Sequence, residues 1–561
     1  MNFALVEVAK NINNVMAGKH NASLLQKKII GTNIFVIICF ILFFVIGLSI
    51  YKDFGISWDE YRNRETGLIS LNYIQNVTGI NLFEINENIP ELDNFIDKDY
   101  GVFFELFLVF IEKILSLNDF KDIFYLRHLI TFIFFWISCI AFYKLAEKIT
   151  HSQLYALIAT LMLIISPRIF ADSFYNSKDI ALLSGFIITI YTLLKFLETT
   201  SWKNLIILSL CSAILINIRL SGIIIPIITC FYLLLPYKLS HIEIFAGKKI
   251  IKTLTFIFLT GFLTIMLWPY LWTSPIQHFI EAFSNMSSFN RWDNLTLYRG
   301  KFIKPSPPPW HYIPTWIGIT TPLIYLICFI VGFCLLIIQY YKKIYDVFNI
   351  KKYGFLTIIF IWLFVPYITT LILHSTLYDG WRHLYFIYPP IILIGIYGIT
   401  VISGYLKNKY TIKKYYTANI IVLLPVLINM IIVSIGMIKN HPQNQVYFNC
   451  LAGKNSGTRY ELDYWGLSYR QAIETILKND TSSQVKIMVH DSPAFYNSLI
   501  LDKSQKNRLI YCSDSTAKYF ISNFRFKANY EKYRNNEYPY VNEIFAVKAW
   551  KNKIAGVYLL K

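Results

Sequence analysis

Long apolar segments separated by short polar loops run through most of this 561-residue chain, and they limit what it can fold into. A helix needs about 20 apolar residues to cross the hydrocarbon core of a bilayer. Eleven segments approach this length, and the sequence therefore predicts a polytopic α-helical membrane protein with about eleven transmembrane helices. The expected spans are 32–50, 128–146, 153–167, 180–197, 204–218, 220–235, 253–270, 315–339, 355–373, 385–404 and 418–438.

The composition agrees with a membrane location. Hydrophobic residues make up 55% of the chain and charged residues 16%, whereas soluble globular proteins carry about 25% charged residues. A net charge of +19 would suggest nucleic-acid binding in a soluble chain. Here the lysines gather in short loops between apolar segments, which is typical of loops retained in the cytoplasm. We therefore expect a lipid bilayer as a partner and no nucleic acid.

The distribution of charge predicts the orientation. Loops 236–252, 340–354 and 405–417 each carry four lysines against at most one acid, whereas residues 51–127 hold 7 basic and 14 acidic residues. With eleven spans, the lysine-rich loops all fall on one side, which predicts a cytoplasmic N-terminus and an extracytoplasmic (periplasmic) C-terminus in the inner (plasma) membrane. The N-terminal region has a long polar lead and no small-residue cleavage site, so its first helix is expected to be retained.

These spans divide the chain into three parts. We expect a cytoplasmic segment over 1–31, a transmembrane domain over 32–438 and a small C-terminal extracytoplasmic α/β domain over 439–561. The transmembrane domain would have outer loops 51–127, 168–179, 271–314 and 374–384. Helical spacing is expected in the first loop over 63–75 and 100–117. In the C-terminal domain we expect a helix over 469–477 and strands over 485–489, 508–512, 519–521 and 555–560. Two cysteines of this domain leave a disulfide open: Cys450 and Cys512.

Two adjacent acids, Asp59 and Glu60, follow the first span by about ten residues. Carboxylates near a bilayer are costly where they dip toward hydrocarbon, so a functional role is one explanation. A surface turn or a helix N-terminus, where acids suit the helix dipole, is the simpler one.

The loop between the third and fourth spans is unusually polar. It places Arg168, Asp172, Asn176, Lys178 and Asp179 between two apolar helices. Capping explains part of this pattern, because an Asn or Ser can open the following helix and Asp179 would then lie in its first turn. Capping and chemistry do not exclude each other.

Cations and aromatic residues mark three more places. Arg219 separates two apolar segments, and Arg382 with His383 precedes the tenth span. Such cations are often interfacial anchors, but an arginine also grips phosphate through paired hydrogen bonds. Three prolines precede Trp310, His311 and Tyr312. Aromatic residues there suit an interfacial belt or offer ring faces to a lipid or a sugar.

Cofactor motifs are missing from the sequence. It contains no P-loop, dinucleotide fingerprint, CxxC pair or HExxH helix. We therefore predict no cofactor and no metal-ligand set, while the participation of a divalent metal ion stays open.

Taken in this order, these residues resemble the dolichyl-phosphate-mannose protein mannosyltransferases and their bacterial relatives, including the aminoarabinose transferases of lipid A. This group belongs to the glycosyltransferase C (GT-C) superfamily and uses lipid-phosphate sugar donors. Its members carry an acid, often an Asp-Glu pair, just after the first span, which Asp59-Glu60 matches. A second acid sits in the next outer loop, where Asp172 and Asp179 compete and Asp179 is preferred. The motifs at 308–314, 380–383 and 463–466 extend the resemblance. The tail does not resemble the β-trefoil inserts of the eukaryotic enzymes, so a protein acceptor is not implied.

The resemblance implies an enzyme that moves a sugar from a polyprenyl-phosphate donor to an acceptor hydroxyl by inverting single displacement. The donor lipid would be undecaprenyl phosphate, because the excess of Lys, Asn, Ile and Phe suggests an AT-rich bacterial genome. The acceptor, a glycan, a lipid or a protein, stays open. The implied roles are catalysis by Asp59, Glu60 and Asp179, donor-phosphate binding by Arg382, His383, Arg219 and Lys178, and a substrate loop with Trp310, His311, Tyr312 and Asp172.

Transport of lipid-linked sugars is the alternative function. Carriers place polar groups near the bilayer midplane and often have internal repeats, whereas the charges here gather at the outer rim and no repeat is visible. A non-catalytic scaffold for envelope assembly would not need paired acids.

Overall fold

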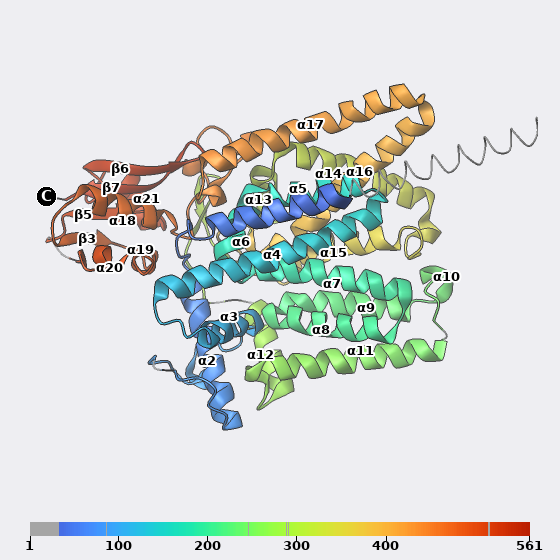
Figure 1. Ribbon diagram of the computed structural model, residues 1–561, viewed down its shortest axis with the longest axis horizontal. Helices are drawn as coiled ribbons and strands as arrows, with labels where there is room; N and C mark the ends of the chain where they lie inside the picture. The colour runs from blue at the N-terminus through green and yellow to red at the C-terminus, as the bar shows by residue number, and fades with distance from the viewer. Residues whose placement is uncertain are drawn as a thin grey trace, which may run out of the picture.

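The computed structural model describes residues 33–560 apart from 86, 245, 288, 290, 514 and 515, so the predicted segment 1–31 lies outside the described residues. Long helices lie side by side, and a small domain of strands and short helices sits at one end of the bundle (Figure 1). The long or paired helices of the bundle are Asn33–Ile50, α4 (Phe120–Thr150), α5 (Gln153–Ile164), α6 (Pro167–Tyr175), α7 (Asp179–Thr199), α8 (Trp202–Ile218), α9 (Ile224–Leu234), α11 (Ala246–Leu267), α13 (Tyr312–Thr320), α14 (Leu323–Lys342), α15 (Gly354–Ile372), α16 (Tyr388–Lys409) and α17 (Ile412–Lys439).

The prediction of a polytopic helical membrane protein is confirmed. Eight helices in the described part of the chain are long and apolar enough to cross a membrane, or nine if the bent pair α5 and α6 forms one span. Two shorter apolar helices, Trp202–Ile218 and Leu220–Leu234, accompany them. The exact number of eleven spans is not confirmed.

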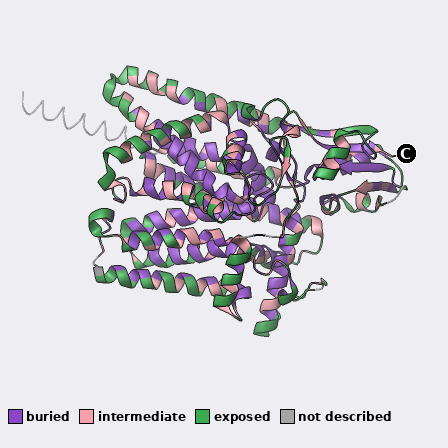
Figure 2. Ribbon diagram, turned by 180° about the vertical axis from the view of Figure 1, so that it is seen from behind, coloured by how far each residue is buried: buried purple, intermediate pink, exposed green. Residues whose placement is uncertain are grey.

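Burial separates central helices from peripheral ones. The apolar window of α7 is 78% buried and that of Arg382–Lys409 is 83% buried, against 28% for α11 and 22% for α14. Buried residues accordingly gather in the middle of the bundle, and exposed ones follow the outer helices (Figure 2). Because the exposed positions of α11 and α14 are largely apolar, lipid rather than water suits their outer faces.

Prolines mark two breaks between helices, one at the end of the expected span 153–167 and one inside the expected span 315–339. Helices α5 and α6 meet at a bend of 67°, with Pro167 in the first turn of α6, where a missing N–H is tolerated. The expected span 315–339 is wrong as one helix. It is interrupted before Pro322, and Thr321 is extended (φ −96°, ψ 139°), as the residue before a proline prefers.

The acidic segment 51–127 folds into two of the helices that the sequence predicts. They are α2 (Glu60–Thr78) and α3 (Phe103–Ile114), with a short 3-10 turn η1 (Leu92–Asn94) between them. Gly67 lets them approach closely, because a Cβ there would lie 2.7 Å from the Glu105 carbonyl oxygen. The buried Arg64 joins the same helices by donating to Glu112 at 2.7 Å. These contacts fix α2, whose first turn carries the acid pair.

The C-terminal domain contains a five-stranded mixed sheet in the order β4-β3-β5-β7-β6. Strands β4, β3 and β5 pair in parallel, whereas β5, β7 and β6 are antiparallel. Four strands and the helix match the expected positions, and β6 was not expected. The bounds are β3 (Val485–Val489), β4 (Leu509–Tyr511), β5 (Tyr519–Ser522), β6 (Glu543–Ala549), β7 (Asn552–Leu559), α18 (Ser468–Asn479), α19 (Pro493–Ser498), α20 (Lys503–Lys506) and α21 (Lys527–Arg534). Cys450 and Cys512 are free.

The two ends of the bundle differ in charge. Helix α10 (Tyr237–Ser240), the start of α11 and the connection from α16 to α17 lie at the end opposite the C-terminal domain (Figure 1). These segments belong to the lysine-rich loops. At the domain's end lie α2, α3, α12 (Pro275–Ser287) and the short 3-10 turns η2 (Leu220–Ile223), η3 (Pro269–Leu271) and η5 (Arg382–Ile387). A hairpin of β1 (Thr296–Tyr298) and β2 (Lys301–Ile303) contacts the C-terminal part through Tyr298 and Tyr460.

Candidate active site

A cavity of about 330 Å³, called here the Arg382 cavity, lies where α2 begins and α8 ends. Side chains that come from distant parts of the sequence line it. One side is charged and the other apolar, an arrangement that suits a ligand with a charged head and an apolar tail. The charged or titratable residues of this cavity include Asp59, Lys178, Arg219, Arg382 and His383. Its apolar residues include Leu220, Ile223, Ile224, Phe283, Met286 and Phe386.

Arg382 is the centre of the charged side. Its guanidinium is buried and lies 3.2 Å from a carboxylate oxygen of each of three acids, Asp59, Asp179 and Asp379. Its Nε has no hydrogen-bond partner among the described residues. Removing one partner of such a buried ionic group typically costs about 3–5 kcal/mol, because the other charge stays buried. The arrangement therefore holds Arg382 in one position.

A tight turn brings Arg382 to this place. Asp379 (φ 54°) and Gly380 (φ 74°) are both left-handed, and η5 begins two residues later. Glycine adopts this conformation without the steric cost that a Cβ imposes, and aspartate tolerates it better than most residues. The reversal places the Asp379 carboxylate beside Arg382.

Asp179 joins Arg382 to Arg219. Asp179 opens α7 and is fully buried. One of its oxygens lies 2.6 Å from Arg219 Nη2 and the other 3.2 Å from Arg382 Nη1. Arg219 reaches it from the C-cap of α8. The carboxylate thus holds two arginines on one side of the cavity.

Lys178 and His383 complete the polar side of the cavity. The Lys178 ammonium lies 3.3 Å from the centre of the Tyr100 ring. Burial, assisted by the charge of Arg219, lowers the pKa of Lys178 to about 8. His383 packs edge-on against Tyr378, and its Nδ1 has no partner among the described residues. Both groups are available to an anion in the cavity.

The two members of the acid pair have different surroundings. Asp59 is the N-cap residue of α2, makes no capping bond with its side chain, and faces the cavity with 34% of that side chain exposed. Glu60 points away and is buried. It accepts a hydrogen bond from Ser57 N at 2.7 Å and lies 3.1 Å from His128 Nε2. Asp59 therefore faces the cavity, whereas Glu60 fastens the start of α2.

Asp172 lies behind the cavity wall. It is buried and accepts hydrogen bonds from the Tyr175 hydroxyl at 2.6 Å and from Asn176 Nδ2 at 3.2 Å. Asn176 also donates to Asp179, at 3.0 Å, and accepts from the Asp179 N–H. The Asn176 side chain therefore both binds a backbone N–H in the first turn of α7 and takes part in the polar network. The two explanations that the sequence offered do not exclude each other. Asp172 supports Asp179 indirectly and, in the described part of the chain, does not line the cavity.

The predicted substrate loop does not meet the other candidates. Among the described residues that line the Arg382 cavity, Trp310, His311 and Tyr312 are absent. His311 Nδ1 is 2.6 Å from the Tyr298 hydroxyl, Tyr312 is buried, and 69% of Trp310 is exposed. These contacts place the loop outside the Arg382 cavity, and its substrate role stays a prediction.

Three contributors were not assigned a role from the sequence. Asp379 lies beside Arg382, Tyr100 lies under Lys178, and Arg525 donates to Asp379 at 2.7 Å from the C-terminal domain. The acid-glycine turn before Arg382 was the one available signal for Asp379. Tyr100 and Arg525 have no local signal, because tertiary contacts alone bring them to the site.

Among the described residues, no three His, Cys, Asp or Glu side chains are arranged to hold a metal ion. The participation of a divalent ion stays open.

Comparisons with known proteins bear on the resemblance. The family model described as dolichyl-phosphate-mannose-protein mannosyltransferase matches residues 107–268, which contain Asp172, Lys178, Asp179 and Arg219. This confirms the predicted likeness to the GT-C superfamily over that part of the chain. No curated protein sequence matches the chain. Among solved structures, the chain is similar to the crystal structure of ArnT from Cupriavidus metallidurans bound to undecaprenyl phosphate, with 11% identity, coverage of 92% of this chain and 97% of that chain, and a TM-score of 0.42.

Proposed function

We propose that this protein is a membrane glycosyltransferase that moves a sugar from a polyprenyl-phosphate donor to an acceptor hydroxyl. The proposal rests on one observation: Asp59 and Arg382 line the same cavity, and the Asp59 carboxylate lies 3.2 Å from the Arg382 guanidinium. Lys178, Arg219 and His383 line the same cavity, and its other side is apolar. Cations suit the phosphate of the donor, and the apolar residues suit the start of its prenyl chain.

The residues divide the chemical work. Asp59 accepts the proton of the acceptor hydroxyl as general base. The acceptor oxygen then forms a bond to the anomeric carbon, while the bond from that carbon to the phosphate oxygen breaks. Its electron pair leaves with the polyprenyl phosphate, and Arg382, with Lys178 and Arg219, stabilises the growing negative charge. One displacement inverts the anomeric centre.

Asp179 receives a positioning role in this proposal. It is buried between Arg219 and Arg382 and contacts both. A carboxylate there fixes the two guanidinium groups before the donor arrives, so that little reorganisation is needed during the reaction. Glu60 and Asp172 support the site from behind it.

The proposed location is the inner (plasma) membrane, with the site and the C-terminal domain on the extracytoplasmic side. The lysine-rich segments lie at the opposite end of the bundle (Figure 1), and such segments remain in the cytoplasm. Undecaprenyl phosphate is the proposed carrier lipid.

The test uses the purified full chain, undecaprenyl phosphate carrying a radiolabelled sugar, and extracted cell envelope. Movement of label from the lipid to an acceptor is the expected result. Movement of the intact labelled lipid between leaflets of a vesicle, without transfer, would identify a carrier and overturn the proposal.

A further inference from the structure

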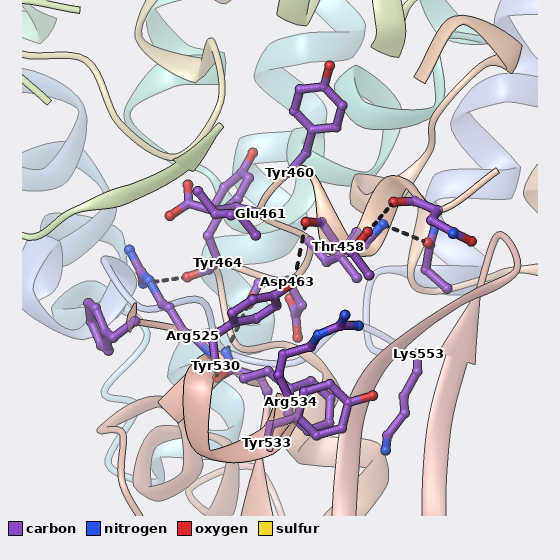
Figure 3. A pocket seen from close by; sticks show the side chains of 18 of the residues that line it. Thr458, Tyr460, Glu461, Asp463, Tyr464, Arg525, Tyr530, Tyr533, Arg534 and Lys553 are labelled. Atoms are coloured by element: carbon purple, nitrogen blue, oxygen red, sulfur yellow. Dashed lines mark hydrogen bonds between the residues drawn. The ribbon is translucent and has the colours of Figure 1, made fainter. Parts of the chain in front are cut away.

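A second cavity, of about 210 Å³, lies between the β1–β2 hairpin, segment 454–464 and the C-terminal domain (Figure 3). We call it the Glu461 cavity. The described residues that line it include none of those that line the Arg382 cavity, and the chemistry proposed above assigns it no role.

Aromatic side chains form much of its wall. Phe302 from the hairpin packs edge-on against Tyr530 from α21, with ring centres 5.6 Å apart. The ring centres of Phe524 and Tyr533 lie 4.1 Å apart on another side of the cavity. The face of an aromatic ring carries partial negative charge, which attracts the C–H groups on the face of a sugar ring. Mixed aromatic and polar walls are those of a small-molecule site.

Unpaired cations accompany these rings. Lys454, Arg534 and Lys551 line the Glu461 cavity, and the ion pairs of the described residues include none of the three. Lys553, by contrast, is paired with Glu543. Arg534 and Lys553 both appear beside the aromatic rings in Figure 3. Free lysine and arginine side chains at a cavity favour an anionic ligand, through charge-assisted hydrogen bonds.

The acids of the Glu461 cavity do not cancel this preference. Asp463 is buried and accepts hydrogen bonds from the N–H groups of Leu467 and Ser468. Glu461 has a buried Oε2 without a hydrogen-bond partner. Burial and the nearby Asp379 carboxylate raise the pKa of Glu461, which favours the neutral form of its carboxyl group and reduces the negative charge beside the cavity.

One wall of the Glu461 cavity is joined to the proposed active site by ion pairs. Arg525 lines this cavity and donates to Asp379 at 2.7 Å, and Asp379 in turn contacts Arg382. The Arg525 guanidinium also lies 4.7 Å from the centre of the Trp58 ring, next to Asp59. A ligand held here would lie on the Trp58 and Arg525 side of Asp59, away from the donor lipid.

We propose that the Glu461 cavity binds an anionic saccharide, a sugar ring that carries a carboxylate or a phosphate, as part of the acceptor. Rings from the hairpin and α21 hold the sugar face, and Lys454, Arg534 and Lys551 hold the anionic group. The acceptor role rests on the proposed transferase function, whereas the binding itself does not.

The experiment measures binding without any donor. Glucuronic acid, glucose 6-phosphate, glucose and inorganic phosphate are titrated into the purified full chain and followed by isothermal titration calorimetry. We expect one or both acidic sugars to bind at least fivefold more tightly than glucose and than phosphate, and the better of the two identifies the anionic group. Glucose or phosphate binding as tightly as the acidic sugars would overturn the proposal, as would no binding of either acid.

Variants assign the binding to this cavity. The double change Arg534→Ala with Lys551→Ala and the single change Tyr530→Ala should each weaken acidic-sugar binding at least fivefold. Lys532→Ala is the matched control, because Lys532 is exposed on the same helix and does not line the cavity, and it should bind as the unaltered protein does. Unchanged binding in the double variant would contradict the site.

Asp59→Asn separates this proposal from the proposed function. It should bind the acidic sugar normally while its transfer rate falls by about 10²–10⁴-fold. If the unaltered protein fails to transfer sugar but binds acidic sugars through Arg534 and Lys551, the transferase proposal fails and the binding site stands.

Discussion

The segments around Asp59 and His311 both combine aromatic and titratable residues, yet they are used differently. Asp59 faces the Arg382 cavity and pairs with an arginine that two further acids hold. His311 is bound to the Tyr298 hydroxyl, between an exposed Trp310 and a buried Tyr312. In the first segment the polar group is left facing a space where a ligand fits, and in the second the polar group is satisfied by the protein itself. A site is therefore marked by where opposite charges converge on a cavity, more than by the residue types present.

The largest effect is expected from Asp59→Asn. An amide cannot take the acceptor proton, and general-base catalysis contributes about 10²–10⁴-fold to rate, so kcat should fall by that amount. The measurement is single-turnover transfer of labelled sugar with saturating donor. A variant that elutes as a monodisperse peak and transfers at more than a tenth of the normal rate would remove Asp59 from the base role.

The next effect concerns the pH dependence of donor use. Because the pKa of Lys178 is lowered to about 8, this side chain is charged below that pH in the free enzyme and neutral above it. The kcat/KM for donor should therefore decline above about pH 8, by roughly tenfold, the value of one charge-assisted hydrogen bond.

Lys178→Arg supplies the matched control for this profile, since arginine stays charged throughout the range. Its kcat/KM should stay level between about pH 7.5 and 9.5, a range that brackets the lowered pKa of Lys178 in the unaltered protein. The same decline in this variant would assign the titration to another group.

A smaller effect on catalysis is expected from Glu60→Gln. The amide can still accept from Ser57 N but loses the carboxylate contact with His128 Nε2, which should cost about 1–3 kcal/mol of stability. The melting temperature in detergent should fall, and the activity of each folded molecule should stay within about threefold. Lost activity at an unchanged melting temperature would place Glu60 in the chemistry.

The smallest effect is expected from His311→Ala. Its partner Tyr298 also donates to Thr315 Oγ1 at 2.9 Å, so the hydroxyl stays satisfied. Transfer should stay within about twofold of normal, as for most changes away from a site. A large rise in the KM for donor would return this segment to the active site and undo the contrast with Asp59.

Much of the fold follows from the sequence, because apolar length dictates helices in a bilayer. The break before Pro322 shows where length alone misleads, since the residue before a proline disfavours the helical conformation. Strand β6 escaped prediction because its first three residues are exposed on one edge of the sheet and its pairing with β7 contains irregular steps, so period-two alternation is weak.

The sequence predicted which charged residues gather at the candidate site, but not which acid pairs with which arginine. Asp59, Lys178, Arg219 and Arg382 were expected together, and the structure places all four on one cavity. Which acid holds which arginine depends on how the helices pack, so Asp379 and Arg525 had no assigned role. The opposite directions of Asp59 and Glu60 follow from the helical start at Glu60 and its contact with His128, which adjacency in sequence cannot reveal.

The most direct test of the account is the affinity of the purified protein for undecaprenyl phosphate, measured for the unaltered chain, Arg382→Ala and Asp59→Asn. A charged hydrogen bond contributes about 1.5–3 kcal/mol, so Arg382→Ala should raise Kd by roughly tenfold or more. Arg382→Lys, which keeps a charge among the three acids, guards against loss of folding and should bind with intermediate affinity. Asp59→Asn should bind at least as tightly as the unaltered chain, because it removes a negative charge beside the phosphate. Equal affinity of the unaltered chain and a folded Arg382→Ala variant would contradict the assignment of this cavity to the lipid phosphate.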